Sequence, residues 1–166
     1  PGVQKIKAAL RQTRRLLAKD KLAADVRVET ERRQRALEAE LQQAEVARKE
    51  RAFALRYHKI KFFERQKVSR KLKQAKKAVD AASSKSEKKK ASSELYDLRV
   101  DLNYILHYPK AKKYISLFPP EVRKGEEPSA ASLAEATKTN ADRDEVKKWI
   151  REQMESGDLP SEPEVE

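Results

Sequence analysis

The sequence predicts an all-α protein, with elongated antiparallel helical hairpins around one very long central helix and a flexible C-terminal tail. Gly and Pro, the residues that most often interrupt helices, are absent between Val3 and Tyr108. Charged residues make up 40% of the 166-residue chain and apolar residues 38%, which suits paired helices better than a deep globular core. We therefore expect a helical-hairpin domain over residues 1–120 and an acidic tail over residues 121–166.

The first two helices are expected on either side of a short turn at 19–25. A first helix from about Val3 to Lys19 is predicted because apolar or small positions recur every three or four residues. These positions are Val3, Ile6, Leu10, Thr13 and Leu17. A second helix from about Ala23 to Val79 would be roughly 85 Å long at 1.5 Å per residue.

A third helix is predicted to begin at a capping box, Ser84–Glu87. Its apolar seam has the same spacing of three and four, at Leu95, Leu98, Leu102 and Ile105. Pro109 should end it, because the residue before proline avoids helical angles. The preceding turn is short, so this helix should fold back antiparallel on the second one. An aromatic segment at 110–120 is then expected to pack against Phe53 and Tyr57.

The tail contains one predicted helix. From Glu121 onward Pro, Gly, Ser and Glu accumulate, as in a solvated linker. A second capping box at Asp142 begins a short amphipathic helix near 142–156, with Gly157 as its stop. Its apolar face, which would dock a partner protein or fold back onto the hairpin, consists of Val146, Trp149 and Ile150. The sequence leaves both alternatives open.

Positive charge is concentrated before the tail. Residues 1–120 carry 32 Lys and Arg against 14 Asp and Glu, whereas 121–166 carry 7 against 13. From Arg48 to Lys90 there are 17 basic and 4 acidic residues. A merely solvated helix with so little balancing charge would repel itself, whereas phosphates would neutralise it. We therefore predict a nucleic-acid-binding surface, and the expected phosphate contacts are Arg51, Lys59, Arg65, Arg70, Lys73, Lys76 and Lys77.

Other interpretations compete with this one. Phe62 lies among basic residues and could stack on an unpaired base, although its seven-residue spacing from Leu55 favours ordinary helix packing. A coiled-coil scaffold without direct RNA contact would use the seams at 37–41 and 95–105. A DNA-binding basic zipper fits less well, because the basic region ends in a hairpin turn rather than a leucine heptad.

Several functional classes are disfavoured. The chain has no Cys and two His, so disulfides, thiolate metal sites and His-rich metal sites are not expected. No apolar run approaches the roughly 18–20 residues of a membrane span. No nucleophile–base set or paired carboxylates indicate catalysis. We expect no enzyme activity, metal, cofactor, small-molecule substrate or membrane association.

Three stretches together resemble the rRNA-processing protein Efg family. They are ADVRVE at 24–29, YHKIKFFERQKVSRKLKQ at 57–74, and VDLNYILHYP at 100–109 running into KYISLFP at 113–119. The resemblance covers about residues 3–120. It implies a non-catalytic ribosome biogenesis factor of the nucleolus, within the small-subunit processome or 90S pre-ribosome. Such a factor would bind pre-rRNA and other processome proteins and support the early cleavages that lead to 18S rRNA.

Overall fold

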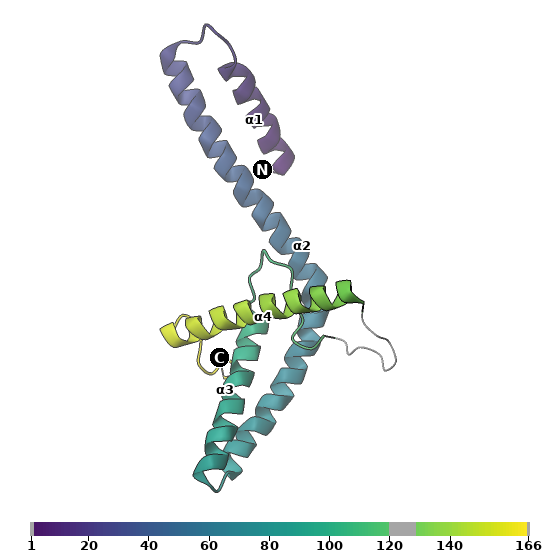
Figure 1. Cartoon of the computed structure of the whole chain (residues 1–166). Coiled ribbons are helices and arrows are strands. Elements are labelled where there is room, and N and C mark those ends of the chain that lie inside the picture. The colour runs from purple at the N-terminus through teal and green to yellow at the C-terminus, as the bar shows by residue number, and fades with distance from the viewer. Residues whose placement is uncertain (1, 120–128, 166) are drawn as a thin grey trace. The chain divides into compact units, whose positions relative to one another are not determined.

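The computed structural model describes residues 2–119 and 129–165, and all regular secondary structure among those residues is α-helix. The helices are α1 (Val3–Leu17), α2 (Ala24–Ala81), α3 (Lys85–His107) and α4 (Ala130–Ser156) (Figure 1). The predicted all-α class and the very long central helix, 58 residues in α2, are both confirmed. The chain forms two compact units, Pro1–Ala54 and Leu55–Glu166, and α2 contributes to both.

Unit 1 is the pairing of α1 with the first part of α2. The predicted seam of α1 is buried at Ile6, Leu10 and Thr13. Ion pairs join Lys7 to Glu45 at 3.8 Å and Arg14 to Glu38 at 3.9 Å. Residue numbers rise along α1 as they fall along α2, so the two helices are antiparallel. Exposed ion pairs of this kind contribute at most about 1 kcal/mol each, so the buried seam supplies most of the stability.

A side chain from α2 closes the end of α1. The Arg27 guanidinium donates to the carbonyl of Leu17 at 3.3 Å and to that of Lys19 at 3.2 Å. The last carbonyls of a helix have no partner within the helix. A cation there is favourable because it donates hydrogen bonds to these carbonyls and because it lies at the negative end of the helix dipole. This contact holds the turn that precedes α2.

Unit 2 begins as a second hairpin, in which α3 returns antiparallel to the last part of α2 (Figure 1). The predicted capping box is present: Ser84 Oγ accepts from the Glu87 N–H at 3.1 Å. The Glu87 carboxylate accepts from the N–H of Ser83 at 3.3 Å, one residue earlier than in the standard box. Helix α3 ends before Pro109, as expected.

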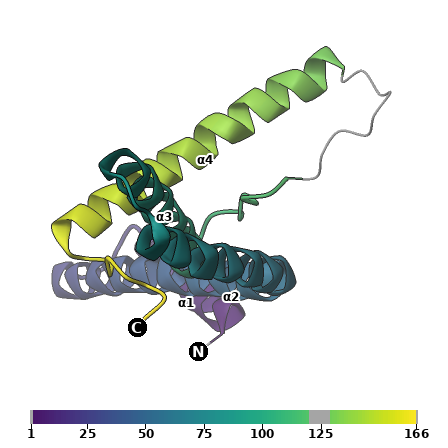
Figure 2. The same cartoon turned by 90° about the horizontal axis from the view of Figure 1, so that it is seen from below.

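The core of unit 2 takes residues from three helices and from the segment after α3. It comprises Val68 and Leu72 of α2, Val100, Leu102, Tyr104 and Ile105 of α3, Tyr108 and Tyr114, and Val146, Ile150 and Met154 of α4. Figure 2 shows α4 lying across α3. An ion pair of 3.5 Å between Lys147 and Asp101 joins these two helices. Burial raises the pKa of the Asp101 carboxyl, although Lys147 opposes that shift.

Helix α4 differs from its prediction near 142–156. It begins twelve residues earlier, where Ser129 Oγ accepts from the Ser132 N–H at 3.2 Å, so Asp142 lies inside the helix. It ends as predicted at Gly157, whose φ of 86° is left-handed. The start of the expected linker, residues 120–128, lies outside the described residues. Residues 129–165 belong to the same compact unit as the hairpin.

Candidate nucleic-acid interface

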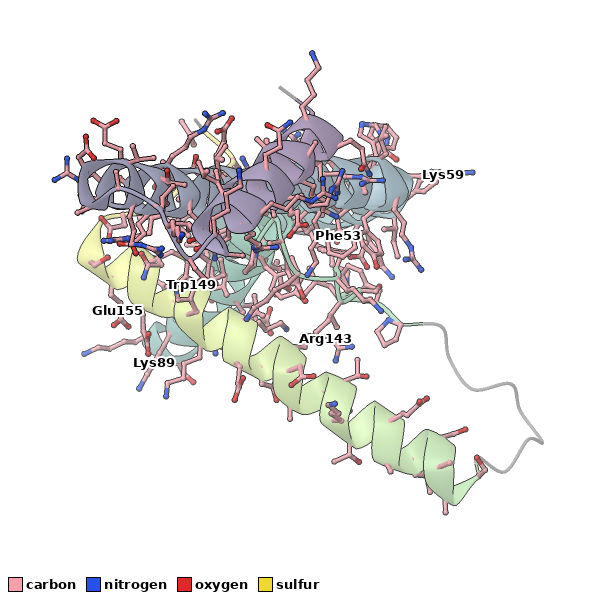
Figure 3. All side chains as sticks on the ribbon, turned by 90° about the horizontal axis from the view of Figure 1, so that it is seen from above. Phe53, Lys59, Lys89, Arg143, Trp149 and Glu155 are labelled. Carbon is pink, nitrogen blue, oxygen red and sulfur yellow. The ribbon has the colours of Figure 1, made fainter. Side chains whose placement is uncertain are left out.

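All seven predicted phosphate contacts lie on α2. Arg51 belongs to unit 1 and the other six to unit 2. Six of the seven are exposed, and Lys76 is half-buried. Figure 3 shows the Lys59 side chain extending outward from its helix. The basic stretch is therefore a solvent-facing surface rather than a set of charges folded inward.

Most of these cations are not neutralised by the chain itself. Among residues 2–119 and 129–165, no carboxylate forms an ion pair with the unit 2 cations Lys59, Arg65, Arg70, Lys73 or Lys77. Arg70, Lys73 and Lys77 are three and four residues apart, so they are neighbours on one face of the helix. Unpaired cations in such an array attract polyanions and release their counterions on binding.

Lys76 is different, because the segment after α4 reaches it. Glu164 pairs with Lys76 at 3.1 Å and with Arg99 at 2.8 Å. The Asn103 amide donates to the Pro160 carbonyl at 2.9 Å, which holds the same segment on α3. Burial opposes ionisation of Glu164, yet its own backbone N–H, Arg99 and Lys76 together leave its pKa below the usual value. Lys76 is thus already partnered within the chain, and it is the weakest of the seven candidates.

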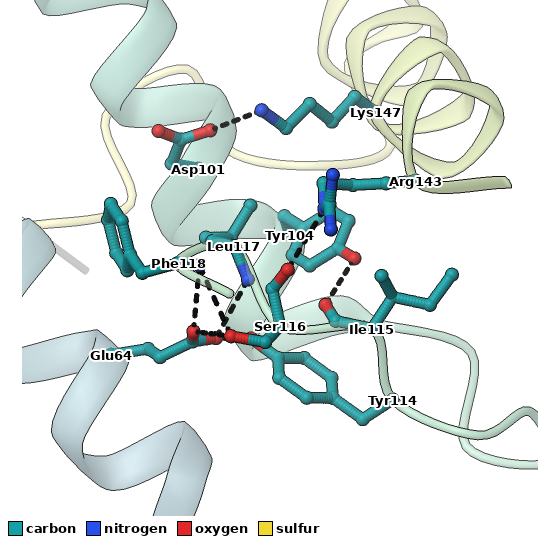
Figure 4. Close-up of polar contacts among 10 residues, drawn as sticks. All are labelled: Glu64, Asp101, Tyr104, Tyr114, Ile115, Ser116, Leu117, Phe118, Arg143 and Lys147. Carbon is teal, nitrogen blue, oxygen red and sulfur yellow. Dashed lines mark hydrogen bonds and ion pairs between the residues drawn. The ribbon is translucent and has the colours of Figure 1, made fainter. Parts of the chain in front are cut away.

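A buried carboxylate, Glu64, fixes the segment that follows α3 onto α2 (Figure 4). Only 5% of Glu64 is exposed. Oε1 accepts from the Tyr114 hydroxyl at 2.6 Å and from the Leu117 N–H at 3.2 Å. Oε2 accepts from the Ser116 hydroxyl at 2.5 Å and from the Phe118 N–H at 3.2 Å. Four donors from one short segment therefore converge on one side chain.

The sequence interpretation missed this role of Glu64, although a signal was present. Glu64 is the single carboxylate between Arg51 and Lys77, and a lone acid in a basic helix needs a reason. Its position on the helix gives no information about the donors, which lie at least 50 residues further along the chain. The reason is structural: the carboxylate accepts the backbone N–H of Leu117 and shares that of Phe118 with Ser116 Oγ.

Aromatic rings cluster around this carboxylate. The predicted packing of the aromatic segment on Tyr57 is confirmed, whereas its packing on Phe53 stays a prediction. The centroids of Tyr57 and Tyr114 lie 6.2 Å apart, and those of Tyr108 and Tyr114 lie 5.0 Å apart. Burial, together with the hydrogen bond to Glu64, raises the pKa of the Tyr114 phenol. The Lys61 ammonium lies 5.1 Å from the Tyr114 ring centroid, and burial lowers its pKa.

Two open cavities flank the exposed aromatic side chains of α2 in unit 2. The cavity beside Phe62 has a volume of about 400 Å³, and the one beside Phe63 about 500 Å³. The first is lined by Phe62, Arg65, Gln66, Ser69 and Arg70. The second is lined by Arg56, Lys59, Ile60, Phe63, Glu64, Lys67, Ser116 and Phe118. Basic and aromatic side chains thus line the same hollows.

The stretches that build this surface also relate the chain to known proteins. The family model described as rRNA-processing protein Efg1 matches residues 6–118. This chain belongs to the rRNA-processing protein Efg1 family. The match includes Glu64 and the segment that it holds, and it confirms the resemblance inferred from the sequence motifs.

Curated relatives carry the same name. An rRNA-processing protein EFG1 from Coprinopsis cinerea is 65% identical over all 166 residues, which are 62% of that protein. One from Cryptococcus neoformans is 51% identical over 120 residues, covering 72% of this chain and 42% of that protein. One from Scheffersomyces stipitis is 38% identical, covering 96% of this chain and 70% of that protein. The chain therefore spans less than two thirds of the first two relatives.

The apolar face predicted on the C-terminal helix is mostly used within this Efg1-family chain. Val146 and Ile150 lie in the core of unit 2, and Ile150 is fully buried. They are therefore not free for a partner protein, and of the two alternatives the structure has the helix folded back. Trp149 keeps 41% of its surface exposed. It lines a cavity of about 640 Å³ together with Tyr108 and Pro109.

Two further kinds of site do not occur in the part of the chain that the structure describes. Over residues 2–119 and 129–165, His, Cys, Asp and Glu form no group of three or more that could hold a metal ion. Within the same residues, every helix is too short or too polar to cross a membrane.

Proposed function

We propose that this chain is the part of an rRNA-processing factor that binds pre-rRNA through the exposed cations of α2. The proposed factor is non-catalytic. It acts in the nucleolus, within the small-subunit processome or 90S pre-ribosome, where it supports the early cleavages towards 18S rRNA. The observation that carries this proposal is a set of five exposed cations on α2 in unit 2, none of which pairs with a carboxylate of the described residues. The relatives of the chain are named rRNA-processing proteins.

The chemistry of these cations suits a phosphate backbone. Each Lys or Arg that meets a phosphate releases condensed counterions, so binding is strong at low salt and largely independent of sequence. Arg65 and Arg70 offer planar donor forks that match phosphate oxygens, whereas Lys59 and Lys73 act as point charges. Pre-rRNA presents both single strands and helices, and charge alone accepts either.

The first test removes charge from this surface. A variant with Lys59, Arg65, Arg70 and Lys73 replaced by Gln should bind RNA more weakly than the wild-type chain. The logarithm of its affinity should also depend less steeply on the logarithm of salt concentration. On single-stranded RNA the slope should fall by about 0.7 for each phosphate that the variant no longer neutralises. Fluorescence anisotropy with labelled RNA over a salt series measures both quantities.

A matched control removes the same charge elsewhere. Lys5, Arg11, Arg15 and Lys19 are exposed residues in or next to α1, and their replacement by Gln should change the salt slope much less. Equal slopes for the two variants and the wild type would refute RNA binding by α2. In cells, ultraviolet crosslinking should give sharp peaks in the 5′ leader or the 18S part of pre-rRNA, and a background profile would contradict the proposal.

The scaffold alternative has less support. In the scaffold alternative the seam at 95–105 binds other chains, but Leu102 and Ile105 are buried in the core of unit 2. Leu37 and Leu41 are half-buried in unit 1, where α1 pairs with α2. Seams already used inside the chain leave less apolar surface for a coiled-coil partner.

A further inference from the structure

Phe62 and Phe63 are two half-exposed rings in the most basic part of α2. Phe62 keeps 51% of its surface exposed and Phe63 keeps 56%. Neither is among the described residues that form the core of unit 2. The rings contact each other edge to face, with their centroids 5.8 Å apart. Because exposing large apolar side chains gives up hydrophobic stabilisation, the folding of unit 2 does not account for them.

Each ring lies beside its own cavity. Consecutive helical residues are turned by about 100° from each other, so the cavity of Phe62 and that of Phe63 open on adjacent faces of α2. Their volumes, about 400 Å³ and about 500 Å³, are in the range of small-ligand sites. A flexible strand that crosses α2 could place one flat group against each ring.

The charges around the two cavities identify the partner as an anion. Arg65 and Arg70 line the cavity of Phe62, and none of its described lining residues is acidic. Lys59 and Lys67 line the cavity of Phe63. The one carboxylate there is Glu64, whose two oxygens are both occupied by hydrogen bonds from the 114–118 segment.

We propose that Phe62 and Phe63 stack on unpaired bases of single-stranded RNA while the flanking cations contact its phosphates. The proposal rests on the proposed RNA binding and names the form of RNA that is bound. Proteins that hold single strands combine a basic groove with aromatic side chains that stack on successive bases. In a duplex the bases are stacked on one another, and the grooves of A-form RNA do not offer a base face to a ring.

A protein partner would use this surface differently. It would gain from the exposed apolar side chain of Leu55, which is 83% exposed and lies seven residues before Phe62. A base-stacking site has no need of Leu55, because an aliphatic side chain offers no flat ring. Leu55 is therefore the residue that separates the two interpretations.

The experiment compares single-stranded with duplex RNA for the whole 166-residue chain. The variant Phe62→Ala/Phe63→Ala should lose about tenfold or more in affinity for a short, labelled, uridine-rich RNA. Its affinity for a duplex of the same length should stay unchanged, and so should the salt slope, because no cation is removed. A second variant with both Phe replaced by Trp instead of Ala should keep the wild-type affinity for single-stranded RNA. Leu55→Ala is the matched control and should bind like the wild type. Both rings are exposed, so circular dichroism and the urea midpoint should show intact folding.

The outcomes separate this inference from the proposed function. Equal losses for single-stranded and duplex RNA, or no loss for either, would overturn base stacking. If the variant with four cations replaced by Gln loses RNA binding and Phe62→Ala/Phe63→Ala does not, the charge proposal stands and the stacking inference fails. If neither variant loses RNA binding, the charge proposal and the stacking inference both fail. If the Phe variant and Leu55→Ala both lower incorporation into pre-ribosomal particles without changing affinity for single strands, the surface docks a protein and the inference is wrong.

Discussion

The substitution Glu64→Gln keeps the size of the side chain but removes its charge and one of its two acceptors. In the wild-type chain the carboxylate accepts four hydrogen bonds, two of them from the backbone N–H groups of Leu117 and Phe118. An amide nitrogen donates and cannot accept. Wherever it is placed, one backbone N–H loses its bond to residue 64, and the hydroxyl of Tyr114 or Ser116 must turn round.

The structure indicates which arrangement costs less. The Phe118 N–H also bonds to Ser116 Oγ at 3.2 Å, so placing the amide nitrogen next to Ser116 leaves that N–H with an acceptor. One hydrogen bond then disappears, and the other bonds lose their charged acceptor. A bond to a charged group contributes about 1.5–3 kcal/mol and a neutral one about 1 kcal/mol, so we expect the free energy of unfolding to fall by about 2–3 kcal/mol.

Urea denaturation at neutral pH, followed by circular dichroism and linear extrapolation, measures this change. The control is Asp80→Asn, which removes the same charge from an exposed position near the end of α2. The control should leave stability within about 0.5 kcal/mol of the wild type. If Glu64→Gln is no more destabilising than this control, the four hydrogen bonds do not hold the segment, and the reasoning is refuted.

Two further predictions concern the end of the chain. Glu164→Gln should destabilise by about 1 kcal/mol at neutral pH. Because the folded-state pKa of Glu164 lies below its ordinary 4.5, the ion pairs stabilise the fold above that pH and are lost as the pH falls through the folded value. The difference between wild type and variant should therefore shrink below about pH 4.5, and a constant difference in urea titrations would contradict this. Gly157→Ala should lower the free energy of unfolding by about 1 kcal/mol, because φ is 86° there and an L side chain is strained at that angle. The added methyl group meets no other atom of the described residues, so backbone strain is the single cost. An unchanged thermal midpoint would contradict this prediction.

Helices α1 and α3 could be predicted because their sequence signals are local. The seam of α1 repeats every three or four residues, and Ser84 with Glu87 marks the start of α3 within one turn. Residues 130–141 gave no such signal. Each of them is exposed in α4, so no side of this part of the helix is buried. The N-cap residue Ser129 is the local mark of its beginning.

The contacts between distant segments could not be predicted. Glu64 meets donors at 114–118, and Glu164 meets Lys76 and Arg99, but helical periodicity only says which residues share a face. The charge of α2 could be counted from the sequence, whereas the pairing of Lys76 depends on where residues 159–165 return. Likewise, Val146 and Ile150 could have faced a partner or the hairpin, and tertiary packing decides between these.

The limits of the family match and those of the folded unit are not the same. The match ends at residue 118, yet Val146, Ile150 and Met154 of α4 supply buried side chains to the core of unit 2. In a fragment cut to residues 6–118, the apolar surface that α4 covers would be exposed to solvent. Such a fragment would be prone to self-association. Tests of activity on fragments of such proteins should therefore take their boundaries from the packed core rather than from the matched residues.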